Sequence, residues 1–436
     1  MKAPKRPGRL QKGGARPRKG AVKSAPVAGH ATETTAIASV VSGFAMIKNI
    51  GLREVYIADT AISDIDGQRG KLVYRGYDIE TLARNSTFEE TAYLLLNGRL
   101  PDAEALADFT NTLKRERWIP QALLDFMARL PHSAAPMDIL QSSLAILAGF
   151  DNDIADVSRE AGYRKSMRII AKTATALAAW ARIREGMGFV APREDLSHAA
   201  NLLYMLKGEA PDAETSRLMD VDLILQAEHQ FNASTFTCRV VASTRAHIYA
   251  CVAAGVGALS GPLHGGATNE VTGMLKEIQQ ADSVAGWVRK CLDSGRRVMG
   301  MGHAVYKTYD PRARVLKGMA ESLLKRGANR KLFDLLTELE RSAREEFSKR
   351  GKPNIYPNVD FYSAFVNQAL GIPPDCSTPV FTASRVAGWC AHIIEEKFAE
   401  AQPKPAIYRP QAHYVGPGAH MNGLPYAPIE ERKPAN

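Results

Sequence analysis

The sequence predicts a mostly α-helical protein, because helical spacing of apolar residues and helix-end signals recur along most of the chain. The first clear helix starts with the capping box TFEE at residues 87–90, continues through an apolar run and stops at Gly98. Only residues 51–74 have the short pattern of strands, with turn residues at Asp66-Gly67 and Arg69-Gly70. No repeat and no GxGxxG fingerprint is present, so neither a repeat array nor a Rossmann domain is indicated.

Three later segments have the same helical pattern. A helix is expected between a cap at Ser197 and a stop at Gly208. Residues 332–349 place apolar side chains three and four apart with charges on the opposite face, and Gly351 follows as a stop. Residues 381–398 show similar spacing and support the all-α prediction.

The composition is typical of a soluble globular protein. The 436 residues are 45% hydrophobic and 23% charged, and they allow two or three structural units. The longest stretch without Asp, Glu, Lys or Arg, from Ala246 to Asn269, holds histidines, a proline and glycines, and it indicates a buried helix that ends in a loop. No apolar secretory signal is present. The cysteines form no CxxC pair and no metal-type spacing, which favours a reducing compartment: Cys238, Cys251, Cys291, Cys376 and Cys390.

The net charge of +10 belongs to the N-terminal end of the chain. The first 23 residues hold nine lysines and arginines and no acid, which leaves about +1 for the rest. We expect residues 1–45 to form a disordered basic tail, because they have too few apolar side chains to fold. A contact with nucleic acid or an anionic surface is an alternative, but no aromatic residues interleave the charges. A mitochondrial presequence is another, although Pro4, Pro7 and Pro17 disfavour the amphipathic helix that it needs.

Three motifs within about a hundred residues supply two histidines and an aspartate: His264 in GPLHGGATNE, His303 in GMGHAVYKTYDPRARVLK and Asp360 in NVDFYSA. Such a set without a serine or cysteine nucleophile indicates proton transfer at carbon rather than acyl-enzyme chemistry. Pro262 and the glycines after His264 allow a ligand to approach closely, so this histidine is suited to stabilise an enolate oxygen. A histidine in a tight turn between helices is the alternative.

The segment around His303 is rich in cations and suits a phosphate-bearing ligand. A loop at a helix start, with Asp310 as a cap before Pro311, explains those two residues but not the clustering of His303 with cations at 307 and 312. The cations of the whole segment are Arg296, Arg297, Lys307 and Arg312.

Further candidates are single polar residues in apolar segments. The neighbours of Asp360 are apolar, and such surroundings raise the pKa of a carboxyl group and make it a usable base. A cap for a helix from Phe361 is the alternative. Arg385 and Arg409 indicate anionic partners, either a ligand or a structural ion pair.

His229 and Asn232 lie three residues apart, so they share a face if this segment is helical. Metal ligation is disfavoured, because asparagine is a poor ligand for transition metals and no HxxxH motif is present.

The motifs AEHQFNAST, GPLHGGA, GMGHAVYKTYDPRA, NVDFYSA, ASRVAGW and YRP, in this order, resemble the citrate synthase family, most of all its bacterial dimeric type. The resemblance covers roughly residues 51–426. It implies an all-α fold of two domains, with the site in the cleft between them and shared between the subunits of a homodimer. The large domain is expected at 46–265 and 372–436, the latter including a C-terminal arm, and a small inserted CoA-side domain at 266–371.

The resemblance also implies an activity: acetyl-CoA, oxaloacetate and water give citrate and CoA, a step of the tricarboxylic acid cycle. Asp360 would take a proton from the methyl group, His264 would stabilise the enol, and His303 would polarise and protonate the oxaloacetate carbonyl. Oxaloacetate would be held by His229, Arg312, Arg385 and Arg409. CoA would meet Arg296, Arg297, Val298, Met299, Gly300 and Lys307. No metal or redox cofactor is implied, since acetyl-CoA is a co-substrate.

Two positions depart from many bacterial members, which have arginine where this chain has Ala304 and Gln411. Both departures concern CoA contacts rather than the chemistry. A 2-methylcitrate synthase that uses propionyl-CoA is the first rival, and dual activity is compatible with the small energy of one methylene. A basic nucleic-acid-binding protein is a rival of another class, but it leaves the three motifs unexplained. We expect a cytoplasmic enzyme, or a mitochondrial one if the tail is a presequence, with no nucleic-acid or membrane partner.

Overall fold

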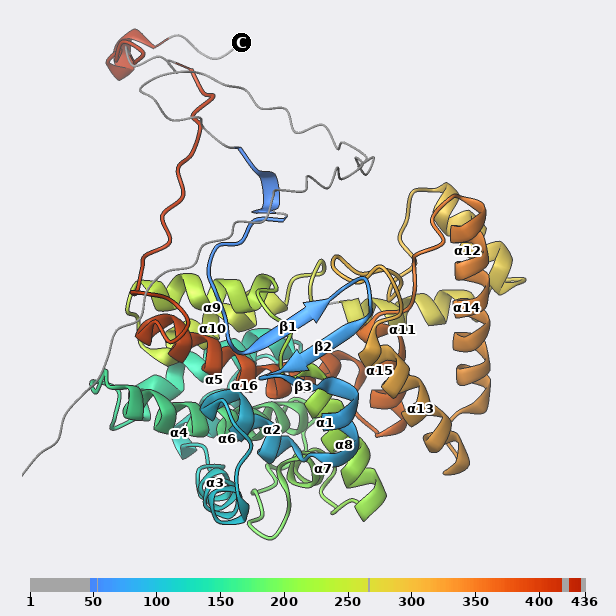
Figure 1. The fold of residues 1–436 in the computed structure, drawn as a ribbon, viewed down its shortest axis with the longest axis horizontal. Coiled ribbons are helices and arrows are strands. Elements are labelled where there is room, and N and C mark those ends of the chain that lie inside the picture. The colour runs from blue at the N-terminus through green and yellow to red at the C-terminus, as the bar shows by residue number, and fades with distance from the viewer. Residues whose placement is uncertain (1–47, 53, 266, 418–422, 433–436) are drawn as a thin grey trace, which may run out of the picture. The chain divides into compact units, whose positions relative to one another are not determined.

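The computed structural model describes residues 48–52, 54–265, 267–417 and 423–432 (Figure 1). The chain divides into two units, Met1–Ile57 and Ala58–Asn436. In the first unit the described residues form one short 3₁₀ turn, Ile50–Leu52. The predicted disordered tail over residues 1–45 lies outside the described residues.

The second unit begins with a small antiparallel sheet in the order β1-β2-β3. Asp64 pairs with Val73 between the first two strands. The predicted strands in residues 51–74 are therefore present as a hairpin, and a short third strand follows just beyond it. The strands are β1 (Ser63–Asp66), β2 (Lys71–Tyr74) and β3 (Tyr77–Asp78).

Sixteen α-helices account for most of the described residues. Ten of them precede the His264 loop: α1 (Ile79–Asn85), α2 (Phe88–Asn97), α3 (Ala103–Arg115), α4 (Gln121–Met127), α5 (Pro136–Leu147), α6 (Arg159–Ile183), α7 (His198–Lys207), α8 (Ala213–Gln226), α9 (Ala233–Ser243) and α10 (Ile248–Leu259). The rest follow it: α11 (Ala267–Ile278), α12 (Val284–Asp293), α13 (Pro311–Lys325), α14 (Arg330–Lys349), α15 (Val359–Ala369) and α16 (Ser377–Phe398).

The predicted helix ends agree with the structure. Thr87 and Ser197 are side-chain caps of α2 and α7. Gly98 and Gly208 end these helices with φ of 77° and 87°, a backbone conformation that glycine adopts without steric strain. The helix predicted from residue 381 begins earlier, at Ser377, because α16 is buried from its first residue to Glu396 and needs no polar face there.

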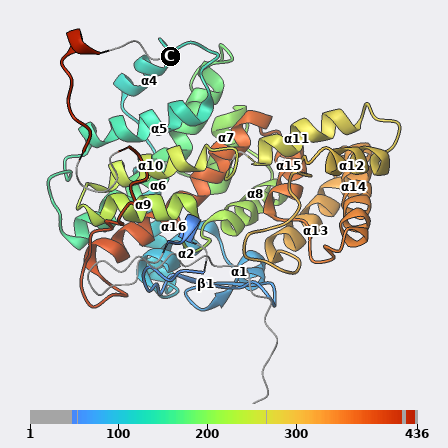
Figure 2. The same ribbon diagram turned by 90° about the horizontal axis from the view of Figure 1, so that it is seen from above.

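Helix α16 is the centre of the packing, and it contacts α6, α9, α10, α2 and α8 (Figure 2). Helices α11 to α15 pack mainly among themselves, through the pairs α13–α15, α12–α14 and α11–α15. They join the other helices through contacts of α13 with α1 and α8, and of α11 with α16. The domain boundaries at residues 266 and 371 stay a prediction.

Two general expectations concern the described residues. Within this part of the chain, no helix has both the length and the apolar character needed to cross a membrane. All five cysteines are buried and free, as expected for thiols that serve as small core residues.

Candidate active site

His229 lies in the connection between α8 and α9 rather than in a helix. The Tyr74 hydroxyl holds this connection, 2.9 Å from the carbonyl oxygen of Glu228 and 3.2 Å from the N–H of the same residue. Asn232 caps α9 by accepting the N–H of Thr235 at 3.1 Å. The segment is not helical, so the condition for a shared helical face of His229 and Asn232 is not met, and Asn232 is instead the N-cap of α9.

His303 lies beside His229, with ring centroids 5.1 Å apart. Its Nδ1 atom accepts the backbone N–H groups of Val305 at 3.0 Å and Tyr306 at 3.3 Å. An N–H can only donate, so Nδ1 carries no proton and the ring proton lies on Nε2. Burial, followed by the charge of Arg312, lowers the pKa of His303 to about 4. This histidine is thus a neutral N–H donor at neutral pH.

Tyr306 completes this cluster. Its hydroxyl lies 3.3 Å from Nε2 of His229, and its ring centroid lies 4.7 Å from that of His303. Burial, followed by the charge of Arg312, lowers the pKa of His229 well below its usual value. Two neutral imidazoles and a phenol therefore line one side of the site.

The loop that carries His303 is fixed to the start of α15. The N–H of Asn358 donates to the carbonyl of Gly300 at 2.9 Å, and its side chain donates to the carbonyl of Gly302 at 2.8 Å. Gly300 has φ of 77°, and a Cβ there would lie 3.0 Å from Phe361, so the close contact with α15 requires glycine. Because Asp360 is in the first turn of α15, these contacts tie it to the His303 loop.

Asp360 is not the cap of its helix. That role belongs to Asn358, whose side chain accepts the N–H of Asp360 at 3.0 Å. The capping alternative for Asp360 is wrong, because the helix begins two residues earlier than the apolar pattern indicated. Its charge acts favourably on the guanidinium of Arg385. A raised pKa for Asp360 stays a prediction.

His264 lies in the turn between α10 and α11 and contacts the start of α9. Its Nε2 atom lies 2.8 Å from the Ser234 hydroxyl and accepts the Ser234 N–H at 3.3 Å. That N–H requires Nε2 to accept, which places the ring proton on Nδ1. Burial, followed by Arg385, lowers the pKa of His264 to about 4. A Cβ at Gly265 would lie 2.6 Å from the carbonyl oxygen of Leu259, so the turn needs this glycine.

Arg312 and Arg385, the two buried arginines among the candidate site residues, differ in their partners. Arg312 forms a two-point ion pair with Asp310, Nη2 to Oδ2 at 2.7 Å and Nε to Oδ1 at 3.1 Å. Asp310 caps α13 and Pro311 follows it, as predicted. Arg385 donates from Nε to the carbonyl of Gln226 at 2.7 Å, and in the described part of the chain its Nη2 atom has no hydrogen-bond partner. A buried guanidinium with an open N–H edge fits a carboxylate of a ligand.

The positions predicted to meet CoA lie on the segment that leads into the His303 loop. Arg297 and Lys307 are exposed, whereas Val298 and Gly300 are buried and Met299 is half-buried. Arg296 is exposed and pairs with Glu277, Nη2 to Oε2 at 2.9 Å. The Lys307 N–H donates to the carbonyl of Gly67 at 2.9 Å, which joins this segment to the turn of the β1–β2 hairpin.

Arg409 is exposed, and it lies near the end of α16 rather than beside the candidate residue Arg385 of its own chain. The preceding Tyr408 donates its hydroxyl to Glu396 at 2.9 Å, near the end of α16. Glu396 is eleven residues beyond Arg385 on this helix, a separation of about 16 Å.

Residues that the sequence did not single out complete the site. Tyr306 contacts His229 and His303, Ser234 orients His264, and Asn358 fixes the His303 loop. All three lie inside the motifs already noted, and their proximity to the histidines in the chain was the available signal. Among the described residues, no group of three or more metal-type side chains could hold an ion.

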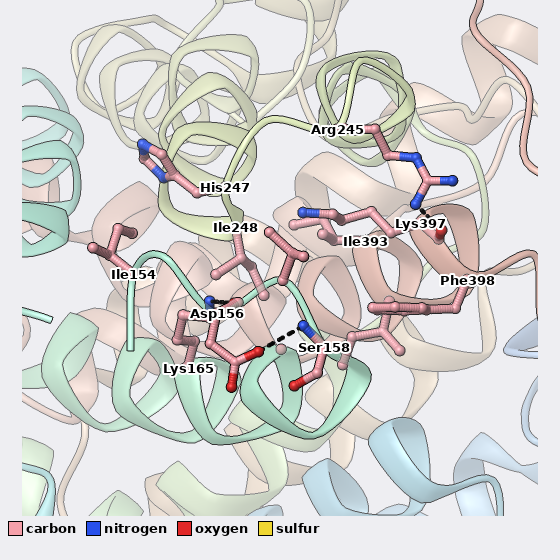
Figure 3. A pocket seen from close by; sticks show the side chains of 13 residues that line it. Ile154, Asp156, Ser158, Lys165, Arg245, His247, Ile248, Ile393, Lys397 and Phe398 are labelled. Carbon is pink, nitrogen blue, oxygen red and sulfur yellow. Dashed lines mark hydrogen bonds between the residues drawn. The ribbon is translucent and has the colours of Figure 1, made fainter. Parts of the chain in front are cut away.

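A cavity of ≈ 50 Å³ between the ends of α6, α10 and α16 contains none of the predicted site residues (Figure 3). Its lining includes apolar side chains and three basic residues. Lys165, Arg245 and Lys397 each donate to a backbone carbonyl, of Asp153, Lys397 and Ala246 respectively. The chain itself thus supplies acceptors for these cations.

Comparison with known proteins extends these observations. The family described as "Citrate synthase, C-terminal domain" matches residues 51–411. Citrate synthase of Synechocystis sp. is 42% identical over 382 residues, which cover 88% of this chain and 93% of the relative. The 2-methylcitrate synthase of Shewanella oneidensis is 35% identical over 367 residues, which cover 84% of this chain and 94% of the relative.

Solved structures agree. The crystal structure of citrate synthase from Pyrobaculum aerophilum has a TM-score of 0.81 and 38% identity, covering 93% of this chain and all of that one. A second structure is the ternary complex of carboxymethyl coenzyme A and oxaloacetate with citrate synthase from Thermoplasma acidophilum. It has a TM-score of 0.81 and 32% identity, covering 88% of this chain and 98% of that one. These matches confirm the predicted mostly helical fold, and the chain belongs to the citrate synthase family.

Proposed function

We propose that this protein condenses acetyl-CoA with oxaloacetate and water to give citrate and CoA, as an acyltransferase that converts the acyl group into an alkyl group. The observation that carries the proposal is the open edge of Arg385 in a buried site that also holds neutral imidazoles. Oxaloacetate is a dianion with a ketone, so it needs buried cations for its carboxylates and an N–H donor for its carbonyl oxygen.

Oxaloacetate binding uses the two arginines differently. Arg385 offers Nη2 to one carboxylate, and this carboxylate supplies a hydrogen-bond partner that Nη2 lacks within the described part of the chain. Arg312 already pairs with Asp310, so it contributes a fixed positive charge rather than two free N–H donors for a carboxylate. The Nε2–H of His303 donates to the ketone oxygen and polarises the carbonyl, while His229 lines the same wall.

Acetyl-CoA is activated from the other side. The Asp360 carboxylate removes a proton from the methyl group, and the Nδ1–H of His264 donates to the thioester oxygen as it becomes an enolate oxygen. The enol carbon then attacks the ketone carbon. The Nε2 proton of His303 reaches the ketone oxygen, which becomes a hydroxyl group, and the proton that Asp360 removed from the methyl group restores the neutral ring of His303. Water finally hydrolyses the thioester and releases citrate and CoA.

A thiol-release assay tests this function and separates it from its rival. We expect CoA release from acetyl-CoA to depend on oxaloacetate and to exceed release from propionyl-CoA. The higher identity to the Synechocystis citrate synthase than to the 2-methylcitrate synthase supports this order. One methylene is worth only about 1–3 kcal/mol in a pocket, so some turnover of propionyl-CoA is compatible with it. No release with either thioester contradicts the proposal.

The exposed position of Arg409 supports a homodimer in which this arginine serves the partner's site. Tyr408 packs near the far end of α16, so Arg409 lies away from Arg385 of its own chain. The arginine that completes each site would therefore have to come from the second subunit. The similarity to the Synechocystis enzyme supports our further proposal of a cytoplasmic location.

A further inference from the structure

A buried network of polar side chains adjoins the oxaloacetate site and takes no part in the chemistry above. Glu228, Arg239, His392 and Glu395 are all 0% exposed. His392 Nε2 lies 2.9 Å from Glu228 Oε1, and the Ser63 hydroxyl donates to the same oxygen at 2.9 Å. On the other side of the ring, Arg239 lies 3.1 Å from His392 Nδ1 and donates to Glu395 at 2.7 Å.

The direction of these bonds is fixed by the arginine. A guanidinium can only donate, so Nδ1 of His392 accepts and its ring proton lies on Nε2, which donates to Glu228. Burial alone would raise the pKa of Glu228, but the contact with His392, the charge of Arg385 and the Ser63 hydroxyl outweigh it and lower the pKa below its usual value. Glu228 is therefore a buried carboxylate whose Oε1 atom is held by two donors.

The other oxygen of Glu228 faces the part of α16 that carries Arg385. Positions 385, 388 and 392 share one face of this helix. A Cβ at Gly388 would lie 2.3 Å from Glu228 Oε2, so the carboxylate rests directly on the helix backbone between the arginine and the histidine. Neither Oε2 of Glu228 nor Nη2 of Arg385 has a hydrogen-bond partner among the described residues. Glu228 Oε2 and Arg385 Nη2 thus lie against one face of α16 without a hydrogen bond between them.

Glu228 nevertheless acts on Arg385 through space. Burial lowers the pKa of Arg385, and the charge of Glu228 is the largest influence that opposes this fall. The guanidinium needs a nearby negative charge to stay buried, yet a direct ion pair would occupy the N–H edge that a substrate carboxylate needs. A carboxylate that lies near the guanidinium, but is held by other donors, provides the negative charge and leaves the N–H edge open.

We propose that Glu228 is a positioning residue, which His392 and Ser63 clamp so that it compensates the charge of Arg385 while leaving Nη2 open for a carboxylate of oxaloacetate. The inference rests on the proposed function and extends it to residues that never touch the substrate. Without the clamp, the carboxylate turns toward Nη2 and competes with the substrate.

The experiment compares His392→Leu with the double variant His392→Leu/Glu228→Gln in the thiol-release assay. We expect His392→Leu to raise the KM for oxaloacetate by about tenfold or more, since a charged hydrogen bond to the substrate must now be exchanged for an existing one. We expect kcat and the KM for acetyl-CoA, at saturating oxaloacetate, to change by less than about threefold. The second change removes the competing charge, so the double variant should have a clearly lower oxaloacetate KM than His392→Leu.

A matched control separates this effect from general damage to the core. His198 is a buried histidine of α7 with 1% exposure, outside the proposed site, and His198→Leu should leave the oxaloacetate KM unchanged. If His392→Leu does not fold, Ser63→Ala removes one of the two clamping donors and should raise the same KM in the same direction. Calorimetry of oxaloacetate binding measures the loss independently of turnover.

The failure of this inference is distinct from failure of the proposed function. A wild-type protein that releases no CoA contradicts the function itself. An active wild type overturns the inference if the clamp variants lower kcat and leave the oxaloacetate KM unchanged. It is equally overturned if the double variant is no better than His392→Leu, because a merely structural role for His392 predicts no rescue by Glu228→Gln.

Discussion

Replacing Arg385 by methionine tests whether this guanidinium serves a ligand or the fold. Burial lowers its pKa from 12.5 to about 10. A base whose pKa is lowered in the folded protein destabilises it at every pH below that pKa, here by about 3 kcal/mol at pH 7. Methionine has similar length and no charge, so the substitution removes this cost.

The substitution also has an unfavourable part. Arg385 Nε donates to the carbonyl of Gln226 at 2.7 Å, and a buried carbonyl left without a donor costs about 1–3 kcal/mol. The two contributions have opposite sign and similar size. We therefore expect the free energy of unfolding of Arg385→Met to differ from that of the wild type by less than about 2 kcal/mol.

Arg312→Met is the matched control. It removes the partner of Asp310, which is 1% exposed and held at two points. A buried carboxylate that loses its cation destabilises a protein by about 3–5 kcal/mol. Two substitutions of buried arginines by the same residue should thus differ clearly in stability.

Denaturant unfolding with and without oxaloacetate measures both effects. The wild type should gain about 2.7 kcal/mol at an oxaloacetate concentration one hundred times Kd. Arg385→Met should gain little at that concentration, because the open N–H edge is gone. If Arg385→Met is as unstable as Arg312→Met while oxaloacetate still stabilises it, Arg385 is a structural residue and the reasoning is refuted.

Four further outcomes are expected. Asp360→Asn should lower kcat by on the order of 10²-fold or more and leave oxaloacetate affinity nearly intact, and near-normal turnover would remove Asp360 as the base. Calorimetry should show that oxaloacetate tightens acetyl-CoA binding and that the coupling is reciprocal; equal affinities with and without oxaloacetate contradict this. Because His264 and His303 have pKa values of about 4, kcat/KM should show no histidine titration near pH 6.5, and stability should fall between pH 6.5 and 4 as the unfolded chain takes up protons first; a pH–rate profile and acid unfolding check both. Arg409→Ala and His264→Ala chains should each be nearly inactive, but verified heterodimers should regain activity; no recovery would mean that Arg409 serves its own chain.

Local signals in the sequence predicted local structure well. Thr87, Ser197 and Asp310 cap helices as expected, since a side-chain cap depends only on residues within one turn. The exceptions also concern helix starts. Asn232 is the N-cap of α9, so the helix that would give it a face in common with His229 is absent, and Asn358 takes the capping role considered for Asp360.

Contacts distant in the chain could not be predicted from the spacing of residues. His229 and Tyr306 meet across 77 positions, and Glu228 and His392 across 164. Such pairs are set by how α16 packs among the other helices, which hydrophobic periodicity does not specify. The sequence motifs therefore indicated the histidines and Asp360, whereas the residues that orient them became visible only in the fold.

Burial acts on the proposed site in two ways that a dianionic substrate reconciles. It keeps the imidazoles of His264 and His303 neutral, so that each offers one fixed N–H to an oxygen that gains charge. It also makes the charge of Arg385 costly, which Glu228 offsets only from a distance. A substrate carboxylate at Nη2 supplies the missing partner, and the neutral donors stay free for the reacting oxygens. Charge recognition and proton transfer are thereby assigned to different side chains of one buried site.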